Sequence, residues 1–252
     1  MAGRLKNSQI DTVLYLYGIS ATAKELKQRV PGVDGQGAIE QVRVGELTCW
    51  ISRVSREDFA DNLGANIENL EWLTEMTPRH QTAVAAISEI SDVLPTRFGT
   101  VFLNETSLAA DINRRKRVLL ADLKRTQGNE EWGVKVFAGQ LQPVHLPKVH
   151  SGKGYLEAKS ALLKSRKPAG DDEELSRFAK ELEKIAVDAT EGGKISGGQR
   201  DLRYQTSLLL KRSDRKRFQA VLKKFANAWG DSRRIECTGP WPPYSFVSGN
   251  SD

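Results

Sequence analysis

The stretch Thr12-Val-Leu-Tyr-Leu-Tyr-Gly-Ile19 is the strongest fold signal in this chain. It is a continuous run of apolar, aromatic and β-branched residues, which predicts a strand buried on both faces. Residues 40–44 and 47–54 follow as a predicted hairpin that turns at Gly45. Alternation places Leu47, Cys49 and Ile51 on one face of its second strand. The chain therefore begins with a small sheet that needs cover on both sides.

Helical spacing follows this sheet. Apolar residues at Ile67, Leu70 and Leu73 predict the inner face of a helix, and Pro78 suits the first turn of a second helix. Pro95 is expected to end that second helix. Residues 1–94 are therefore predicted to form an N-terminal α/β domain.

The remaining residues, 95–252, repeat one order of elements. A strand at 98–103, a helix at 108–123 and a strand at 132–138 precede a helical insertion at about 139–200. A strand at 204–210, a helix capped by Ser213 and a strand at 233–237 follow. Strand–helix–strand occurring twice is the order of a ferredoxin-like, split βαβ domain. We therefore expect an α+β fold with two domains, the second ferredoxin-like.

The positive charge of the chain is concentrated in one segment. The 252 residues carry 38 Lys and Arg against 32 Asp and Glu, and residues 203–234 alone carry ten basic and two acidic residues. The predicted helix there presents four basic residues away from its apolar stripe: Arg215, Lys216, Lys223 and Lys224. Such a face is either simply solvated or a binding surface for an acidic partner.

The segment Gly239-Pro-Trp-Pro-Pro-Tyr-Ser-Phe-Val247 combines prolines with three aromatic residues. Proline fixes φ and stiffens the backbone that carries Trp241, Tyr244 and Phe246. One interpretation is a tail that folds back and caps the core. The other is an aromatic patch offered to a partner protein, since Trp and Tyr provide much contact area. Both interpretations remain open from the sequence.

No catalytic, metal or cofactor site is predicted. His80, His145 and His150 have no nucleophile or carboxylate at motif spacing and are expected to be surface or capping residues. The glycine-rich stretch 191–199 is expected to be a loop and lacks the GxxxxGK[ST] pattern of a phosphate-binding loop. The chain contains no apolar run of about 18 residues and no signal-peptide pattern. We therefore expect a cytoplasmic protein without a membrane segment.

Nucleic acid binding is the alternative function. A ferredoxin-like sheet is the plan of RNA-recognition domains, and the basic helix would add an electrostatic surface. However, Arg97-Phe-Gly-Thr-Val-Phe102 departs from their first aromatic motif in its glycine position and aromatic spacing. We keep this alternative but do not expect nucleic acid as the main partner.

Six segments, in this order, resemble the gas vesicle protein F/L family across about residues 12–248. The most specific are Leu94-Pro-Thr-Arg-Phe-Gly-Thr-Val-Phe102 and Gly239–Phe246; the others are Thr12–Ile19, Val54–Phe59, Leu70–Leu73 with His80, and Glu131–Val136. The resemblance does not separate type F from type L.

The resemblance implies a protein that is not an enzyme and needs no cofactor. It implies an accessory or minor structural component of gas vesicle assembly, in contact with the small hydrophobic shell protein and other gas vesicle proteins. The implied fold has two domains, the second ferredoxin-like with a helical insertion. Location in the cytoplasm and at the gas vesicle follows from the same resemblance.

Overall fold

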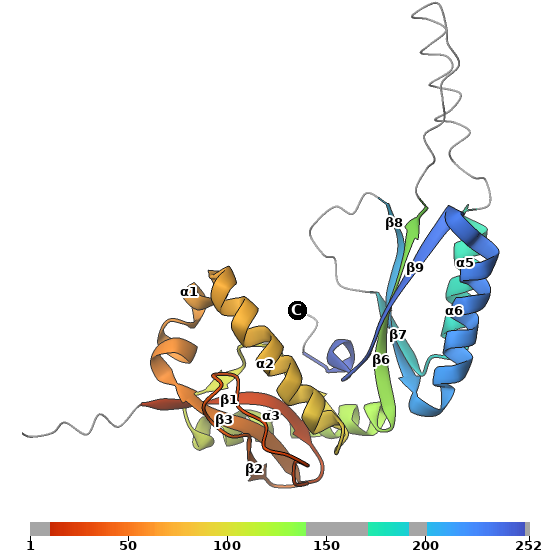
Figure 1. The fold of residues 1–252 in the computed structure, drawn as a ribbon. Coiled ribbons are helices and arrows are strands. Elements are labelled where there is room, and N and C mark those ends of the chain that lie inside the picture. The colour runs from red at the N-terminus through yellow and green to blue at the C-terminus, as the bar shows by residue number, and fades with distance from the viewer. Residues whose placement is uncertain (1–10, 140–170, 192–200, 250–252) are drawn as a thin grey trace, which may run out of the picture. The chain divides into compact units, whose positions relative to one another are not determined.

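The computed structural model describes residues 11–139, 171–191 and 201–249. The chain forms two compact units (Figure 1). The first contains residues 1–131 together with 240–252, and the second contains residues 132–239. This division differs from the expected boundary after residue 94, because the next helix and the last segment of the chain both belong to the first unit.

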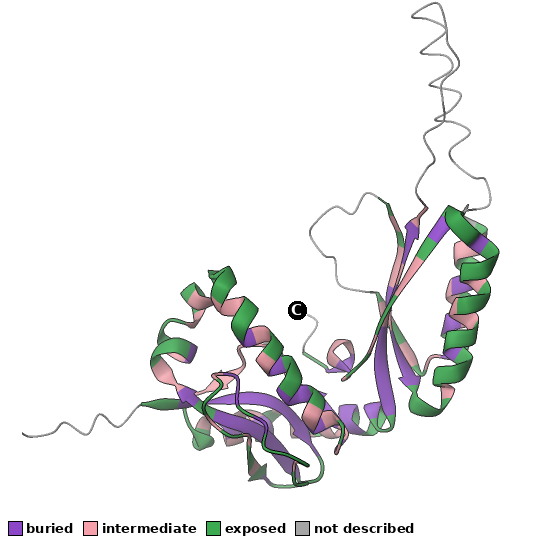
Figure 2. Ribbon diagram, in the orientation of Figure 1, coloured by how far each residue is buried: buried purple, intermediate pink, exposed green. Residues whose placement is uncertain are grey.

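An antiparallel sheet forms the centre of the first unit. It contains β1 (Thr12–Ser20), β2 (Glu40–Val44), β3 (Leu47–Ser55) and β4 (Val93–Pro95) in the order β2-β3-β1-β4, and β5 (Val101–Phe102) also pairs with β1. The predicted first strand and hairpin are confirmed. The interior of β1 is buried, as Figure 2 shows, because helices cover both faces of the sheet.

The side chains of β1 alternate between these two faces, and a bulge shifts the alternation so that Ile19 lies on the same face as Leu16. Tyr17 lies at the register shift between Leu16 and Gly18, opposite β3. Tyr15 and Tyr17 face α2 (Leu70–Ser88), whereas Leu16 and Ile19 face α3 (Glu105–Thr126). Gly18 is required at the bulge, since a Cβ there would lie 2.7 Å from the Leu94 carbonyl oxygen of β4.

The helices of the first unit differ in part from the expectation. A π-helical turn η1 (Glu57–Asp61) and α1 (Leu63–Glu68) precede α2. Pro78 lies inside α2 and does not begin a helix. The true start is Asn69, whose side chain accepts hydrogen bonds from the N–H groups of Glu71 and Trp72. Burial of Met76 and Val84 on either side of Pro78 keeps the helix continuous.

The second unit has the ferredoxin-like order among the residues that the structure describes. Its elements are β6 (Asn129–Ala138), α5 (Asp171–Glu183), β7 (Asp188–Glu191), β8 (Leu202–Lys211), the 3₁₀ turns η2 (Arg212–Asp214) and η3 (Gly230–Ser232), α6 (Arg215–Trp229) and β9 (Arg233–Trp241). The strands are ordered β7-β8-β6-β9, and α5 and α6 lie on one face of the sheet (Figure 1). The predicted α+β class is confirmed.

The elements that build this second unit differ from the predicted ones. The strand expected at 98–103 is only β5, which pairs with Leu14 and Tyr15 of β1 and so belongs to the first unit together with α3. The first helix and second strand of the ferredoxin-like unit are α5 and β7, which lie within the predicted insertion. Phe178 of α5 is fully buried in the core of the second unit.

Three smaller expectations have different outcomes. Ser213 lies in η2 and makes no capping hydrogen bond, because α6 begins two residues later. Part of the glycine-rich loop, 192–199, and the residues His145 and His150 lie outside the described residues. Within the described ranges, no helix is both long and apolar enough to cross a membrane, and no cluster of three or more His, Cys, Asp or Glu has metal-binding geometry.

Candidate partner-binding surfaces

The C-terminal segment 240–248 packs onto the first unit. A single 3₁₀ turn, η4 (Tyr244–Phe246), buries Phe246, of which 3% remains exposed. Val247 joins the apolar cluster of Leu119 and Leu123 on α3. In this structure Phe246 therefore forms no exposed patch. Of the two interpretations of this segment, the tail that folds back and caps the core fits the positions of Phe246 and Tyr244.

Buried carboxylates hold this segment in place. Glu131 accepts hydrogen bonds from the backbone N–H and the hydroxyl of Ser245, at 2.8 and 2.6 Å. Asp122 of α3 accepts two more from Ser248, at 2.7 and 3.0 Å. The guanidinium of Arg125 donates to the Phe246 carbonyl oxygen at 2.5 Å. These contacts satisfy acidic side chains that would otherwise be costly to bury.

Sequence reasoning missed Asp122 and Glu131. The available signal was an acidic residue on the apolar stripe of a helix, since Asp122 follows Leu119 by three residues. A buried carboxylate needs hydrogen-bond donors, but the sequence does not show that Ser245 and Ser248 provide them.

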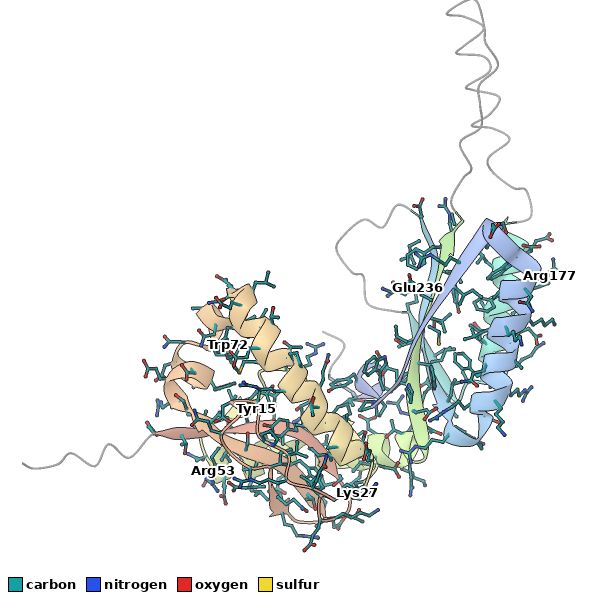
Figure 3. All side chains as sticks on the ribbon, viewed as in Figure 1. Tyr15, Lys27, Arg53, Trp72, Arg177 and Glu236 are labelled. Carbon is teal, nitrogen blue, oxygen red and sulfur yellow. The ribbon has the colours of Figure 1, made fainter. Side chains whose placement is uncertain are left out.

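His80 joins the C-terminal segment to the central strand. Its Nδ1 atom lies 2.9 Å from the hydroxyl of Tyr15, and its Nε2 atom lies 3.2 Å from the hydroxyl of Tyr244. The Tyr15 oxygen also accepts a hydrogen bond from the Gly99 N–H at 3.1 Å. Tyr15, labelled in Figure 3, and Phe98 pack edge-on against the imidazole.

These surroundings keep His80 neutral. Burial lowers the pKa of His80 to about 4, against a smaller opposing effect of a hydrogen bond with the Thr96 backbone. Burial also raises the pKa values of Tyr15 and Tyr244. The expectation that His80 is a surface or capping residue is wrong, because aromatic side chains enclose it. The cluster is a structural clamp made of neutral hydrogen bonds.

Trp241 has a different position from the two aromatic residues that follow it. It lies at the end of β9 with 47% of its surface exposed, between Pro240 and Pro242. Of the three aromatic candidates, Trp241 is the one that is exposed.

The basic helix is exposed as the sequence predicts. Arg215, Lys216, Lys223 and Lys224 are all exposed on α6 (Figure 2 shows the outer side of this helix in green). Arg215 lies over the ring of Trp132, with its guanidinium carbon 5.9 Å from the ring centroid.

A groove lies between α6 and α5. Phe225, Ala228 and Trp229 form its apolar part, four basic residues line it as well (Arg177, Lys180, Lys184 and Lys224), and its volume is about 390 Å³. Arg177 is labelled in Figure 3. The two acidic residues of the groove have cationic partners within the second unit, because Glu174 pairs with Arg233 and Glu181 with Lys184. We call this feature the α5–α6 groove.

The first unit carries a surface of opposite charge. Residues 57–75 contain six acidic residues and no Lys or Arg. Between these acids, Leu70 is 77% exposed and Ile67 is 42% exposed. The sequence predicted both on an inner helix face, but the core contacts of α2 are made from Met76 onward and by Trp72. We call this feature the α1–α2 surface.

The fold and these surfaces define a class: a two-unit α+β protein whose second unit is ferredoxin-like. Two solved structures share this fold. The crystal structure of the gas vesicle protein GvpF from Anabaena sp. PCC7120 superposes with a TM-score of 0.71 at 18% identity, covering 94% of this chain and 96% of that one. GvpF from Microcystis aeruginosa gives 0.69 at 18% identity, with 94% and 99% covered.

Sequence comparison identifies the family. The profile of the family described as gas vesicle synthesis protein GvpL/GvpF matches residues 13–248, and the chain belongs to this family, which takes part in gas vesicle formation. Gas vesicle protein L of Streptomyces sp. (strain CB03234) is 28% identical, with 94% of this chain and 93% of that protein covered. Gas vesicle protein F of Haloferax mediterranei is 24% identical, with 93% and 92% covered.

Proposed function

We propose that this protein is a non-enzymatic accessory or minor structural component of gas vesicle assembly. In this proposal it binds the small hydrophobic shell protein, together with other gas vesicle proteins, in the cytoplasm and at the growing vesicle. A small apolar subunit aggregates unless a partner covers its surface before assembly. The proposed role is to provide that cover.

The observation that carries this proposal is Trp241. About half of its surface is accessible, while Tyr244 and Phe246 fix the backbone directly after it. Prolines on both sides hold the backbone stiff, so that little conformational entropy is lost when a partner binds. A large, pre-organised aromatic side chain is typical of residues that dominate binding energy.

The test is co-purification of the tagged protein with the shell protein of its own gene cluster, after nuclease treatment and at about 150 mM salt. We expect retention of the shell protein by the wild type and at least about tenfold less by Trp241→Ala. Val118→Ala on α3 is the matched control, since Val118 is also 47% exposed. Equal retention by Trp241→Ala and the wild type contradicts the role of Trp241, and no retention by the wild type contradicts the proposed partner.

The basic residues of α6 are proposed as a second contact, with an acidic patch on a partner. Exchange of Lys216 and Lys223 for Gln should weaken that contact, and raising the salt from about 50 to 300 mM should weaken it further, because exposed charge pairs are screened over about 10 Å or less. Binding that does not change with salt contradicts this contact.

Nucleic acid remains the alternative partner, favoured by the ferredoxin-like sheet and the exposed basic helix. The same co-purification distinguishes it. Nucleic acid retained in untreated lysate, without shell protein, would favour this alternative, and affinity for homopolymer RNA should then fall steeply with salt.

A further inference from the structure

We infer that the α1–α2 surface of one molecule binds the α5–α6 groove of a second copy, in a head-to-tail self-association. The inference does not depend on the proposed function, because the partner here is a second copy of this chain and not the shell protein. It gives the exposed apolar side chain and the open groove the same partner, a second copy of the chain.

Leu70 is the proposed apolar contact on the first surface. It is the first residue of α2, and most of its side chain faces solvent. Its acidic neighbours Glu68 and Glu71 are exposed as well. No ion pair involves either glutamate among the described residues, in contrast to Glu75, which pairs with Arg79. The surface is therefore an exposed leucine flanked by two negative charges.

The groove has the complementary composition. Its floor of Phe225, Ala228 and Trp229 is apolar, and its volume exceeds that of a leucine side chain. At its rim, Lys180 and Lys224 are exposed, and the Lys224 ammonium lies 5.7 Å from the centroid of the Phe225 ring. A leucine entering the groove would bring its flanking carboxylates to these cations.

A second copy fits this combination because charge and apolar surface match in both directions. Each molecule carries one surface of each kind, so that the contact joins different patches on the two partners. Such heterologous contacts close into rings or continue as open chains. The contact is small, and we expect a weak association with a dissociation constant of about 10–100 µM.

The experiment is sedimentation velocity of the full chain over about 1–300 µM, a range that brackets the expected constant. The wild type should show reversible association that weakens with salt. Leu70→Ser should weaken it by about tenfold or more. Leu103→Ser is the matched control and should leave it unchanged, since Leu103 is also largely exposed on the first unit.

Charge-reversed variants test directly whether the two surfaces bind each other. Glu68→Lys/Glu71→Lys and Lys180→Glu/Lys224→Glu should each abolish self-association, because the exchanged side chains then face charges of their own sign across the contact. Mixing the two variants should restore association, since the intact surface of one matches the intact groove of the other, and the two reversed patches also match each other. Circular dichroism verifies that both variants are folded.

Three results would overturn the inference. They are a wild type that stays monomeric at every concentration, association that survives both reversals, and reversed variants that remain monomeric when mixed. If the wild type is monomeric but Leu70→Ser no longer retains shell protein, the α1–α2 surface binds the shell protein instead.

Discussion

His80 connects β1, α2 and the C-terminal segment with hydrogen bonds between neutral groups. A charged imidazole at this position would lose hydration, and no carboxylate hydrogen-bonds to it in the described structure. A neutral imidazole has one donor and one acceptor nitrogen, and the two tyrosine hydroxyls can satisfy both without charge.

This arrangement makes stability depend on pH. The pKa of His80 is about 4 in the folded chain and 6.5 ordinarily, so that only the unfolded chain takes up this proton between these values. Stability should therefore decrease as the pH falls from about 6.5 to about 4, by at most about 3 kcal/mol from this residue. Urea unfolding of the wild type and His80→Gln at several pH values measures this contribution.

The difference in unfolding free energy between the two proteins should shrink on acidification. Above pH 7 the variant lacks the hydrogen bonds of His80 and should be less stable than the wild type. A difference that stays constant between pH 7 and pH 4 would show that His80 does not titrate as its surroundings imply.

At the residue scale, the sequence shows composition but not surroundings. The exposure of the α6 cations was foreseen, because a helix with one apolar stripe must place its charges outside. The burial of His80 and Asp122 was not foreseen, since their partners lie about 65 and 126 residues away. Leu70 shows the opposite error, an apolar residue at helical spacing that remains exposed.

Among the elements, the C-terminal segment has the clearest structural role. Its turn η4 buries Phe246, while Trp241 shortly before it is exposed. Phe246→Ala should therefore lower the unfolding free energy by about 3 kcal/mol or more, because it removes a buried aromatic side chain. Trp241→Ala should change it by less than about 1 kcal/mol. Chemical denaturation of both variants tests this contrast, and similar losses would contradict the described burial.

Long elements with strong periodicity were predicted well, and short or interrupted ones were not. The strand at 12–19 and the helix at 108–123 are confirmed as β1 and α3, because each has an unbroken pattern of buried residues. Pro78 was interpreted as a helix start, although tertiary burial carries α2 through it. The strand expected at 98–103 has only two paired residues, since the turn at Gly99 precedes it.

The whole molecule contains separate cores in its two units. Phe178 belongs to the core of the second unit, and Ile112 to a core of the first. Phe178→Ala should destabilise the second unit by about 3–5 kcal/mol and accelerate amide exchange in β6–β8, while α2 and α3 keep their protection. Ile112→Ala should give the converse pattern. Hydrogen exchange with mass spectrometry resolves the two, and equal acceleration throughout would mean that the units unfold together.

At this scale the sequence predicted the fold class but not the division of the chain. The order strand–helix–strand occurs at 98–138 as well as in the second unit, and local patterns do not show which strands pair. Pairing of β5 with β1 decides that α3 belongs to the first unit. Residues 240–248 bind that unit through hydrogen bonds between residues more than 100 positions apart in the sequence. Contacts at such separations leave no periodic pattern in the sequence.

The membership of residues 240–248 in the first unit has a consequence for how the chain is made. During translation, residues up to 131 emerge first, and Tyr244, Phe246 and Val247 follow more than 100 residues later. Nascent chains generally fold from the N-terminal domain onward. This first domain, however, lacks part of its core until the ribosome has also made the whole second unit. The first unit therefore completes its core only late in synthesis, when Tyr244 reaches His80 and forms the clamp.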